Sequence, residues 1–244
     1  MAKYTLFNYL NFKDNINKSD YFSTGEKIIM GILNITEDSF YDGGKYLQPK
    51  KIISQVKKML DEGASIIDIG AQSTKPNAIS KGPHEECKIL LPAIKLLRKK
   101  FKNIFISTDT YWSLVAEQSI KSGANMINDV SAGNIDPNML KTISKLKVPY
   151  VLMHMQGRPE NMQNNPNYKD VVNEVYSFFE KKIKELENLG FNDIIIDPGL
   201  GFGKNLEHNY TLLNNLHEFK KLNYPILVGA SRKSMIYKLL NISP

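Results

Sequence analysis

The sequence has little cysteine, little arginine and no long apolar run. Its single cysteine, Cys87, has no second cysteine with which to pair, which excludes a disulfide-stapled secreted domain. No run approaches the roughly 18 apolar residues that a membrane-spanning helix needs. The polar N-terminal stretch, residues 1–24, contains no apolar signal-peptide core. We therefore expect a cytoplasmic protein with no membrane partner.

Arginine is scarce although the chain is basic. The net charge is +7, yet arginine accounts for only three of the 32 basic residues, Arg98, Arg158 and Arg232. The lysines are spread along predicted helices, whereas nucleic-acid binders more often cluster basic residues among aromatic ones. We expect no nucleic-acid partner. The same charge would suit a small anionic substrate.

Repeated β-α patterns fill an ordinary globular composition, with 42% hydrophobic and 23% charged residues. Apolar runs without polar alternation predict strands buried on both faces of a parallel sheet, at residues 28–33, 65–69, 104–107, 126–130, 150–153, 194–196 and 226–228. Amphipathic segments predict helices near residues 52–60, 85–100, 112–122, 137–146, 170–189, 206–219 and 232–240.

This α/β pattern fits either a barrel or an open doubly wound sheet. Unusual polar residues follow every predicted strand. A barrel gathers all strand ends at one mouth, whereas an open sheet uses mainly its switch point. The pattern therefore favours a (β/α)₈ TIM barrel. Because only seven strands can be counted, we expect the last β-α unit to be lacking in this chain.

Asn34 ends the first predicted strand and opens a long loop rich in aspartate and glycine. Its amide oxygen is a suitable ligand for Mg²⁺, a cation whose coordination substrate phosphates and water usually complete. The alternative is an ordinary surface loop with turn residues.

Carboxylates and an amide follow the next strands. Asp109 follows the third strand, Asn128 and Asp129 close the fourth, and Asp197 closes the sixth. An amide beside a carboxylate, with a second carboxylate across the mouth, can bind both donors and acceptors of an amino-pyrimidinone edge. This combination favours a pterin-like or guanine-like ring. Asp68 is either part of this group or a buried structural carboxylate.

Two further clusters follow later strands. Residues 231–234, with Ser231, Arg232 and Lys233, begin a predicted helix and could bind an anion; the alternative is a serine cap with solvated cations. His154 could act as an acid or base, or be a hydrogen-bonded structural residue. The neighbouring Met153 is expected to line a pocket wall.

Taken together, the segments from about Ile28 to Ser243 resemble dihydropteroate synthase. The matching strings are GILNITEDSFYDGG at 31–44, GASIIDIG at 63–70, NDVS at 128–131, LMHMQG at 152–157, DPGLGFGK at 197–204 and GASRKSMI at 229–236. The resemblance implies one pterin-binding barrel domain over residues 1–244, with residues 1–24 as a polar extension. It also implies a homodimer.

The implied activity is a transferase reaction of folate biosynthesis and a target of sulfonamides. Such an enzyme condenses 4-aminobenzoate with 7,8-dihydropterin-6-ylmethyl diphosphate and releases pyrophosphate with the help of Mg²⁺. By motif, the resemblance implies that the catalytic residues are Asn34, Asp109, Asp197 and Lys233. Asn34 would contact Mg²⁺ and the diphosphate. The implied substrate-binding residues are Thr74, Asp109, Asn128, Met153, Asp197, Phe202, Ser231, Arg232 and Lys233.

Some features depart from the family pattern. The usual Gly-Gly-Glu-Ser-Thr-Arg-Pro loop reads GAQSTKP at 70–76, where Lys75 keeps the charge without bidentate recognition. No counterpart of the Arg-x-His pair of the family's last strand is found. Two alternatives therefore accompany the synthase: a corrinoid-linked pterin methyltransferase and a non-catalytic pterin-binding remnant.

Overall fold

The computed structural model describes residues 27–35, 41–42, 46–72, 81–158, 162 and 165–242. Six parallel strands form one sheet in the order β1-β4-β5-β6-β7-β8. Their bounds are β1 Met30–Asn34, β4 Ile66–Gly70, β5 Phe105–Asp109, β6 Met126–Asp129, β7 Tyr150–Met153 and β8 Ile194–Asp197. A short antiparallel pair consists of β2, Tyr41–Asp42, and β3, Tyr46–Leu47.

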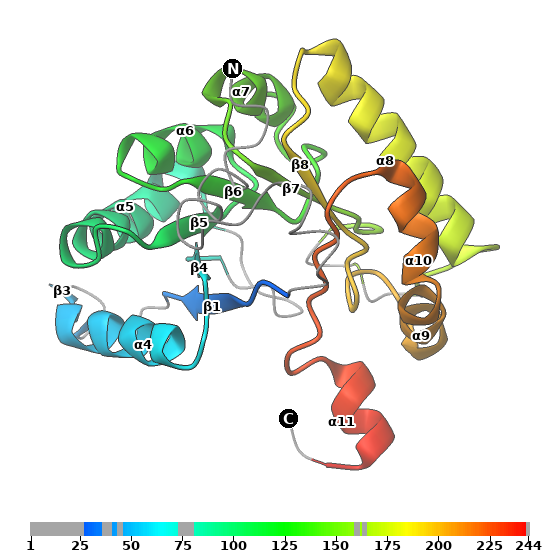
Figure 1. The fold of residues 1–244 in the computed structure, drawn as a ribbon, viewed down its shortest axis with the longest axis horizontal. Coiled ribbons are helices and arrows are strands. Elements are labelled where there is room, and N and C mark those ends of the chain that lie inside the picture. The colour runs from blue at the N-terminus through cyan, green and yellow to red at the C-terminus, as the bar shows by residue number, and fades with distance from the viewer. Residues whose placement is uncertain are drawn as a thin grey trace.

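The helices lie outside the sheet, and those from α4 to α8 each connect two consecutive strands of it (Figure 1). The helices are α4 Pro49–Asp61, α5 Pro83–Lys100, α6 Ser113–Lys121, α7 Met139–Leu146, α8 Val171–Asn188, α9 Leu206–Asn214, α10 Leu216–Phe219, the 3₁₀ helix η1 Lys220–Leu222 and α11 Ser234–Leu240. Because the paired strands of the sheet run parallel, their carboxyl ends all lie on the same side. The predicted site residues at the strand ends therefore lie on this side of the sheet.

The apolar core has an inner and an outer part. Side chains inside the curve of the sheet form a small cluster made of Ile66, Phe105, Met126, Val151 and Ile195. Two larger clusters lie between the sheet and its helices, one over β1, β4 and β5 and the other over β6 to β8. Packing on both faces explains why β4, β6, β7 and β8 are buried along their whole length, as their unbroken apolar runs predict.

The first predicted strand departs from this pattern. Ile32 of β1 is 55% exposed, because β1 pairs only with β4 among the strands that the structure describes. The expectation that β1 is buried on both faces is therefore wrong.

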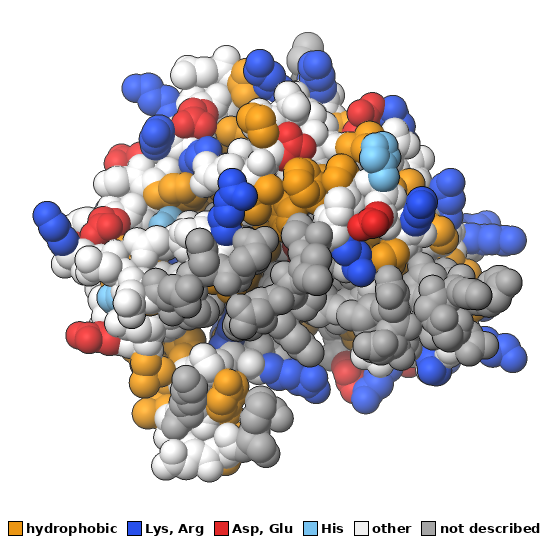
Figure 2. Space-filling model, turned by 180° about the vertical axis from the view of Figure 1, so that it is seen from behind, with side chains coloured by type: hydrophobic (Ala, Val, Ile, Leu, Met, Phe, Trp, Pro, Cys, Tyr) orange, Lys and Arg blue, Asp and Glu red, His pale blue; other side chains and the backbone are white. Residues whose placement is uncertain are grey.

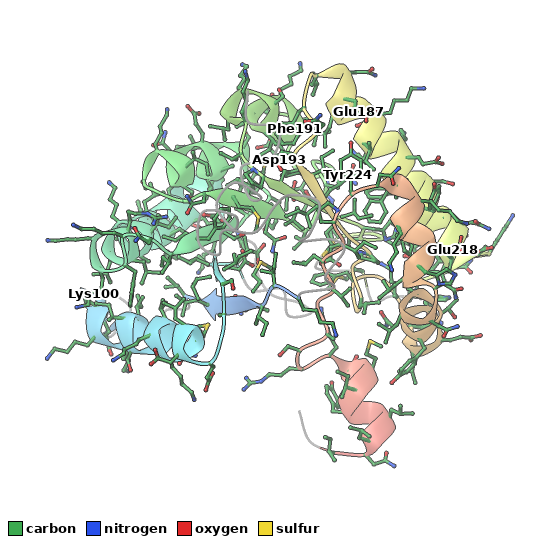
Figure 3. The ribbon with its side chains drawn as sticks, in the orientation of Figure 1. Lys100, Glu187, Phe191, Asp193, Glu218 and Tyr224 are labelled. Atoms are coloured by element: carbon green, nitrogen blue, oxygen red, sulfur yellow. The ribbon has the colours of Figure 1, made fainter. Side chains whose placement is uncertain are left out.

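The predicted strand at 226–228 is also wrong. Ile226 makes a single parallel bridge to Ile196, and Val228 is exposed. Tyr224 donates a hydrogen bond to Glu187 of α8, which fastens the start of this segment to the outer helices (Figure 3). Because its six parallel strands pair in chain order with a helix after each, the described sheet is part of a (β/α)₈ barrel.

Two differences from the predicted helices concern the C-terminal part of the chain. The predicted helix over 206–219 is divided into α9 and α10 at Asn215. The helix expected from residue 232 begins at Ser234. No described helix has the length and apolarity to cross a membrane. On the face shown in Figure 2, basic side chains lie at many separate points with acidic ones among them.

Candidate active site

A polar row crosses the carboxyl ends of four neighbouring strands. The sheet register pairs Asn34 with Gly70, Gly70 with Asp109, and Asp109 with Asn128. A Cβ atom added at Gly70 would lie 3.2 Å from Asp109 Oδ2 and 3.3 Å from Asn34 Oδ1. The side chains of Asn34 and Asp109 therefore flank Gly70 closely. Three of the predicted site residues thus lie in one row.

Asn128 is oriented by a buried carboxylate. Its Nδ2 donates to Asp68 Oδ2 at 3.0 Å across the inside of the sheet. Burial raises the pKa of Asp68, while the hydrogen bond from Asn128 opposes this shift. Asp68 therefore supports a predicted binding residue, which fits the structural alternative.

Asp109 lies among other carboxylates. Its pKa is raised well above the ordinary value by burial and by the negative charges of Asp68, Glu86 and Asp129. Burial and the neighbouring negative charges therefore disfavour the ionised form of Asp109, whereas hydrogen-bond donors brought by a ligand would favour it. Asp109 can therefore either donate or accept a hydrogen bond to a ring edge.

Asp129 has a structural role. Its carboxylate accepts hydrogen bonds from Ser131 N and Oγ, each at 2.7 Å, from Gly133 N at 2.8 Å and from Tyr150 Oη at 2.7 Å. These four donors fix the turn that follows β6. Of the Asn128-Asp129 pair, only Asn128 is therefore available to the mouth.

Behind the row lies a pair that the sequence reasoning missed. Gln72 donates to the fully buried Glu86, and burial raises the pKa of Glu86 to about 7. The Gln72 amide also pairs with the Lys81 backbone, accepting from its N at 2.9 Å and donating to its O at 2.8 Å. Gln72 thereby joins the two described ends of the β4–α5 connection. Thr74 lies outside the described residues.

Glu86 carried a usable signal in the sequence. It precedes Ile89, Leu90 and Ala93 at helical spacing, so it occupies the apolar face of α5. A carboxylate on such a face requires a buried polar partner.

On the other side of the mouth, Asp197 ends β8 beside Met153 of β7, its register partner. Asp197 Oδ1 accepts a hydrogen bond from Gly199 N at 2.7 Å. Burial raises the pKa of Asp197 to about 6, against the opposing effects of the Gly199 bond and of the cations Lys233 and Lys204. Asp197 is therefore an ionisable acceptor near neutral pH.

Lys233 and Phe202 form a wall of this half of the mouth. The Lys233 ammonium lies 4.2 Å from the centre of the Phe202 ring, a cation–π contact. Phe202 packs against the cluster that contains Met153. Burial lowers the pKa of Lys233, and the nearby Asp197 charge opposes this. Met153, Asp197, Phe202 and Lys233 are thus brought together as the sequence predicts.

Ser231 and Arg232 are placed differently. Both side chains are exposed, and α11 begins only at Ser234. Lys233 is the residue at the helix cap, and no side chain caps this end. The helix predicted from residue 232 therefore begins two residues later, because Arg232 adopts a left-handed backbone with φ of 53°. The alternative of a serine cap is not observed either.

His154 is a buried partner of Lys204. Its Nδ1 lies 2.9 Å from Lys204 Nζ. Burial, together with the Lys204 charge, lowers the pKa of His154 to about 2. A neutral imidazole that accepts from an ammonium fits the structural alternative rather than acid–base chemistry. Lys204 itself was given no role by sequence reasoning.

The described residues contain no group of three His, Cys, Asp or Glu side chains that could hold a metal ion. Asn34 is exposed at the end of β1 and offers one amide oxygen. This donor set fits Mg²⁺ better than it fits a transition metal, because Mg²⁺ is usually bound by one or two protein oxygens together with phosphates and water.

A parallel barrel whose mouth holds carboxylates, an amide and a lysine over an aromatic ring defines a site for a small planar heterocycle. The family model described as "Pterin binding enzyme" matches residues 30–244, and the chain belongs to this family.

Individual relatives indicate a more specific activity than the family model does. The chain is 45% identical to dihydropteroate synthase of Haemophilus influenzae over 215 residues, which are 87% of this chain and 78% of that protein. It is 43% identical to the Clostridium beijerinckii dihydropteroate synthase, covering 92% of this chain and 81% of that protein. These similarities support the synthase over the two alternatives.

The similar solved structures are dihydropteroate synthases as well. The Yersinia pestis dihydropteroate synthase in a sulfonamide drug complex superposes with a TM-score of 0.80 at 41% identity, covering 88% of this chain and 78% of that one. The Xanthomonas albilineans dihydropteroate synthase with 4-aminobenzoic acid gives 0.81 at 36% identity, covering 90% and 78%. The chain thus shares its barrel fold with dihydropteroate synthases and is related to these enzymes of folate synthesis.

Proposed function

We propose that this chain catalyses the dihydropteroate synthase reaction. The amine nitrogen of 4-aminobenzoate attacks the methylene carbon of 7,8-dihydropterin-6-ylmethyl diphosphate. A carbon–nitrogen bond forms, the carbon–oxygen bond to diphosphate breaks, and the amine loses a proton. The observation that carries the proposal is the placement of Asp109, Asn128 and Asp197 around one mouth in a chain 45% identical to a dihydropteroate synthase.

The pterin edge binds to the carboxylates and the amide. The amino group and ring N–H of a pterin are donors, and Asp109 and Asp197 supply acceptors for them. Because Asn128 is held by Asp68, its amide plane has one orientation when the ring arrives. Asp109 ionises or remains protonated according to what the ring presents, which suits a heterocycle with both donors and acceptors.

The pterin face lies against the wall formed by Phe202, Lys233 and Met153. The Lys233 cation also favours the ionised form of Asp197. Positive charge next to Asp197 therefore keeps that carboxylate ready to accept hydrogen bonds.

We propose that the diphosphate lies toward Asn34; the family resemblance also assigns Thr74 to it, a residue outside the described ranges. We propose that Asn34 contributes an oxygen ligand to Mg²⁺, and the donor set at the end of β1 supports this. When bound, Mg²⁺ neutralises charge on the departing diphosphate. Arg232 and Ser231, which are exposed just before α11, are proposed to contact anionic groups of the substrates, Ser231 on the side of 4-aminobenzoate.

The test is pyrophosphate release by the chain given the pterin diphosphate, Mg²⁺ and 4-aminobenzoate. We expect release that depends on 4-aminobenzoate and that stops when Mg²⁺ is chelated. Binding of the pterin diphosphate without turnover would instead indicate the non-catalytic remnant. Methyl transfer from a methylated pterin to a corrinoid would indicate the methyltransferase.

The cytoplasmic location and the homodimer stay predictions. Sedimentation equilibrium at two protein concentrations would measure the oligomeric state.

A further inference from the structure

We propose that Lys204 is a positioning residue for the pterin site, because its buried ammonium fastens the loop after β8 to the loop after β7 and thereby places Phe202 and Lys233 beside Asp197. The β8 loop is residues 198–204, and the β7 loop is residues 154–158. The inference rests on the proposed function, since it concerns how that site holds its pterin.

The ammonium of Lys204 joins the two loops directly. Lys204 is 2% exposed, and its Nζ lies 2.9 Å from His154 Nδ1, 3.3 Å from His154 O and 3.0 Å from Phe202 O. An ammonium has three hydrogens and no acceptor, so these three atoms match its capacity. Two of the acceptors belong to the β7 loop, and the third is the carbonyl of a wall residue.

The two loops touch backbone to backbone. A Cβ atom at Gly199 would lie 2.0 Å from His154 O, and one at Gly203 would lie 2.4 Å from Gln156 O. This close approach buries the His154 carbonyl away from water, where an unpaired carbonyl is costly. The Lys204 ammonium supplies a donor that satisfies it. The loops therefore depend on this cation for their mutual position.

A second clamp holds the same loop from α9. Asn209 Oδ1 accepts from Gly201 N at 2.6 Å, and Asn209 Nδ2 donates to Lys204 O at 3.3 Å. A Cβ atom at Gly201 would lie 3.2 Å from Lys233 Cδ, so the Gly201 backbone packs against the stem of Lys233. The β8 loop thus touches Lys233 with the Gly201 backbone as well as with the Phe202 ring.

Charge links Lys204 to the same site. The titratable groups around it are His154 from the β7 loop, Asp197 from β8, Lys233 before α11 and Tyr168, whose hydroxyl donates to Gly203 O at 2.8 Å. Burial lowers the pKa of Lys204 to about 7, and the charge of Asp197 opposes this shift. In their charged forms, both Lys204 and Lys233 oppose the upward shift of the Asp197 pKa. Loss of the Lys204 charge should therefore raise the pKa of Asp197 further, which a purely structural residue would not do.

The experiment replaces Lys204 with methionine, which keeps the length of the side chain and removes the ammonium. We expect the Kd for the pterin diphosphate, measured calorimetrically with Mg²⁺ and without 4-aminobenzoate, to rise roughly tenfold, because the wall is misplaced. The acid limb of the pH profile of kcat/KM should shift to higher pH. The KM for 4-aminobenzoate at saturating pterin should stay within about twofold of wild type.

Arg98→Met is the matched control. Arg98 is also a cation that binds backbone carbonyls, donating to Gly123 O at 2.8 Å and to Ile104 O at 2.9 Å, but it lies near the amino ends of β5 and β6. We expect this variant to lower Tm without changing the Kd for the pterin diphosphate. A wild-type Kd and pH profile in Lys204→Met, or an equal rise of Kd in Arg98→Met, would overturn the proposal.

Asn209→Ala provides a second measurement in case Lys204→Met does not fold. It removes the other clamp without leaving a charge unpaired, and we expect the Kd for the pterin diphosphate to rise several-fold. An unchanged Kd in folded Asn209→Ala would contradict positioning by the β8 loop. A wild-type chain that binds the pterin diphosphate without turnover would refute the proposed function, while the Kd comparison would still decide the role of Lys204.

Discussion

Asn128 and Asp68 are joined by a hydrogen bond of 3.0 Å between side chains from β6 and β4, two strands separated by β5. One partner is a predicted binding residue at the mouth, and the other is buried and 3% exposed. The bond shows how a residue inside the barrel can determine the orientation of a residue at its rim.

Replacement of Asp68 should therefore affect catalysis although Asp68 lies beneath the mouth. In Asp68→Ala the Asn128 amide loses its acceptor, and we expect kcat/KM to fall about tenfold, or about 1.4 kcal/mol of transition-state stabilisation. Steady-state kinetics would measure this. Asp68→Asn keeps an acceptor oxygen and should lose less; an equal loss in both variants would contradict the orienting role.

Asp197 and Lys233 should each be necessary for efficient turnover. We expect Asp197→Asn and Lys233→Ala to lower kcat/KM at least about tenfold, because one removes a carboxylate acceptor and the other removes the cation beside it. Lys184→Ala, an exposed change on α8, serves as the kinetic control. Wild-type kinetics in both site variants would refute the assignment.

Glu86 should make the stability depend on pH. Burial raises its folded pKa to about 7 from 4.5, so the folded state binds more protons than the unfolded state between these values. Stability from this group is therefore complete below about pH 4.5 and decreases as pH rises toward 7 by up to about 3 kcal/mol.

Glu86→Gln removes this titration and keeps an acceptor for Gln72. Urea unfolding at pH 5 and pH 8 should show a smaller loss of stability in the variant than in wild type. Equal losses in the two proteins would indicate that Glu86 does not titrate in this range.

Gly199 should tolerate no side chain. Its φ is +68°, and a Cβ atom there would lie 2.0 Å from a backbone oxygen, so we expect Gly199→Ala to lose about 3 kcal/mol or more. Gly63 is the matched control, since its φ is +102° but nothing lies within 4 Å of its Cβ position. Gly63→Ala should cost less, about 1–2 kcal/mol, the cost of backbone strain alone. Thermal unfolding of the two variants would separate steric overlap from strain.

The sequence predicted the fold where burial alone determines structure. The apolar runs at β4, β5, β6, β7 and β8 gave strands within two residues of their observed bounds, because strands packed on both faces need such runs. The same reasoning failed at 226–228, where an apolar run makes one bridge to Ile196. Apolar composition does not specify a pairing partner.

The structure brings together those predicted site residues that lie at the carboxyl ends of strands. The strand register places Asn34, Asp109 and Asn128 in one row. Their proximity could be predicted because the end of an apolar run marks the end of a strand. The contacts of Lys204 and Glu86 were not predictable in the same way, since Lys204 meets His154 from 50 positions away in the chain. Such pairs depend on how two loops meet after folding.

The pairing of the Gln72 amide with the Lys81 backbone has a practical consequence for engineering. It holds the two described ends of one chain segment to each other and to Glu86. Insertions, deletions or randomised libraries confined to residues 73–80 should leave β4 and α5 in place. The effect of residues 73–80 on turnover can therefore be measured separately from the stability of the barrel.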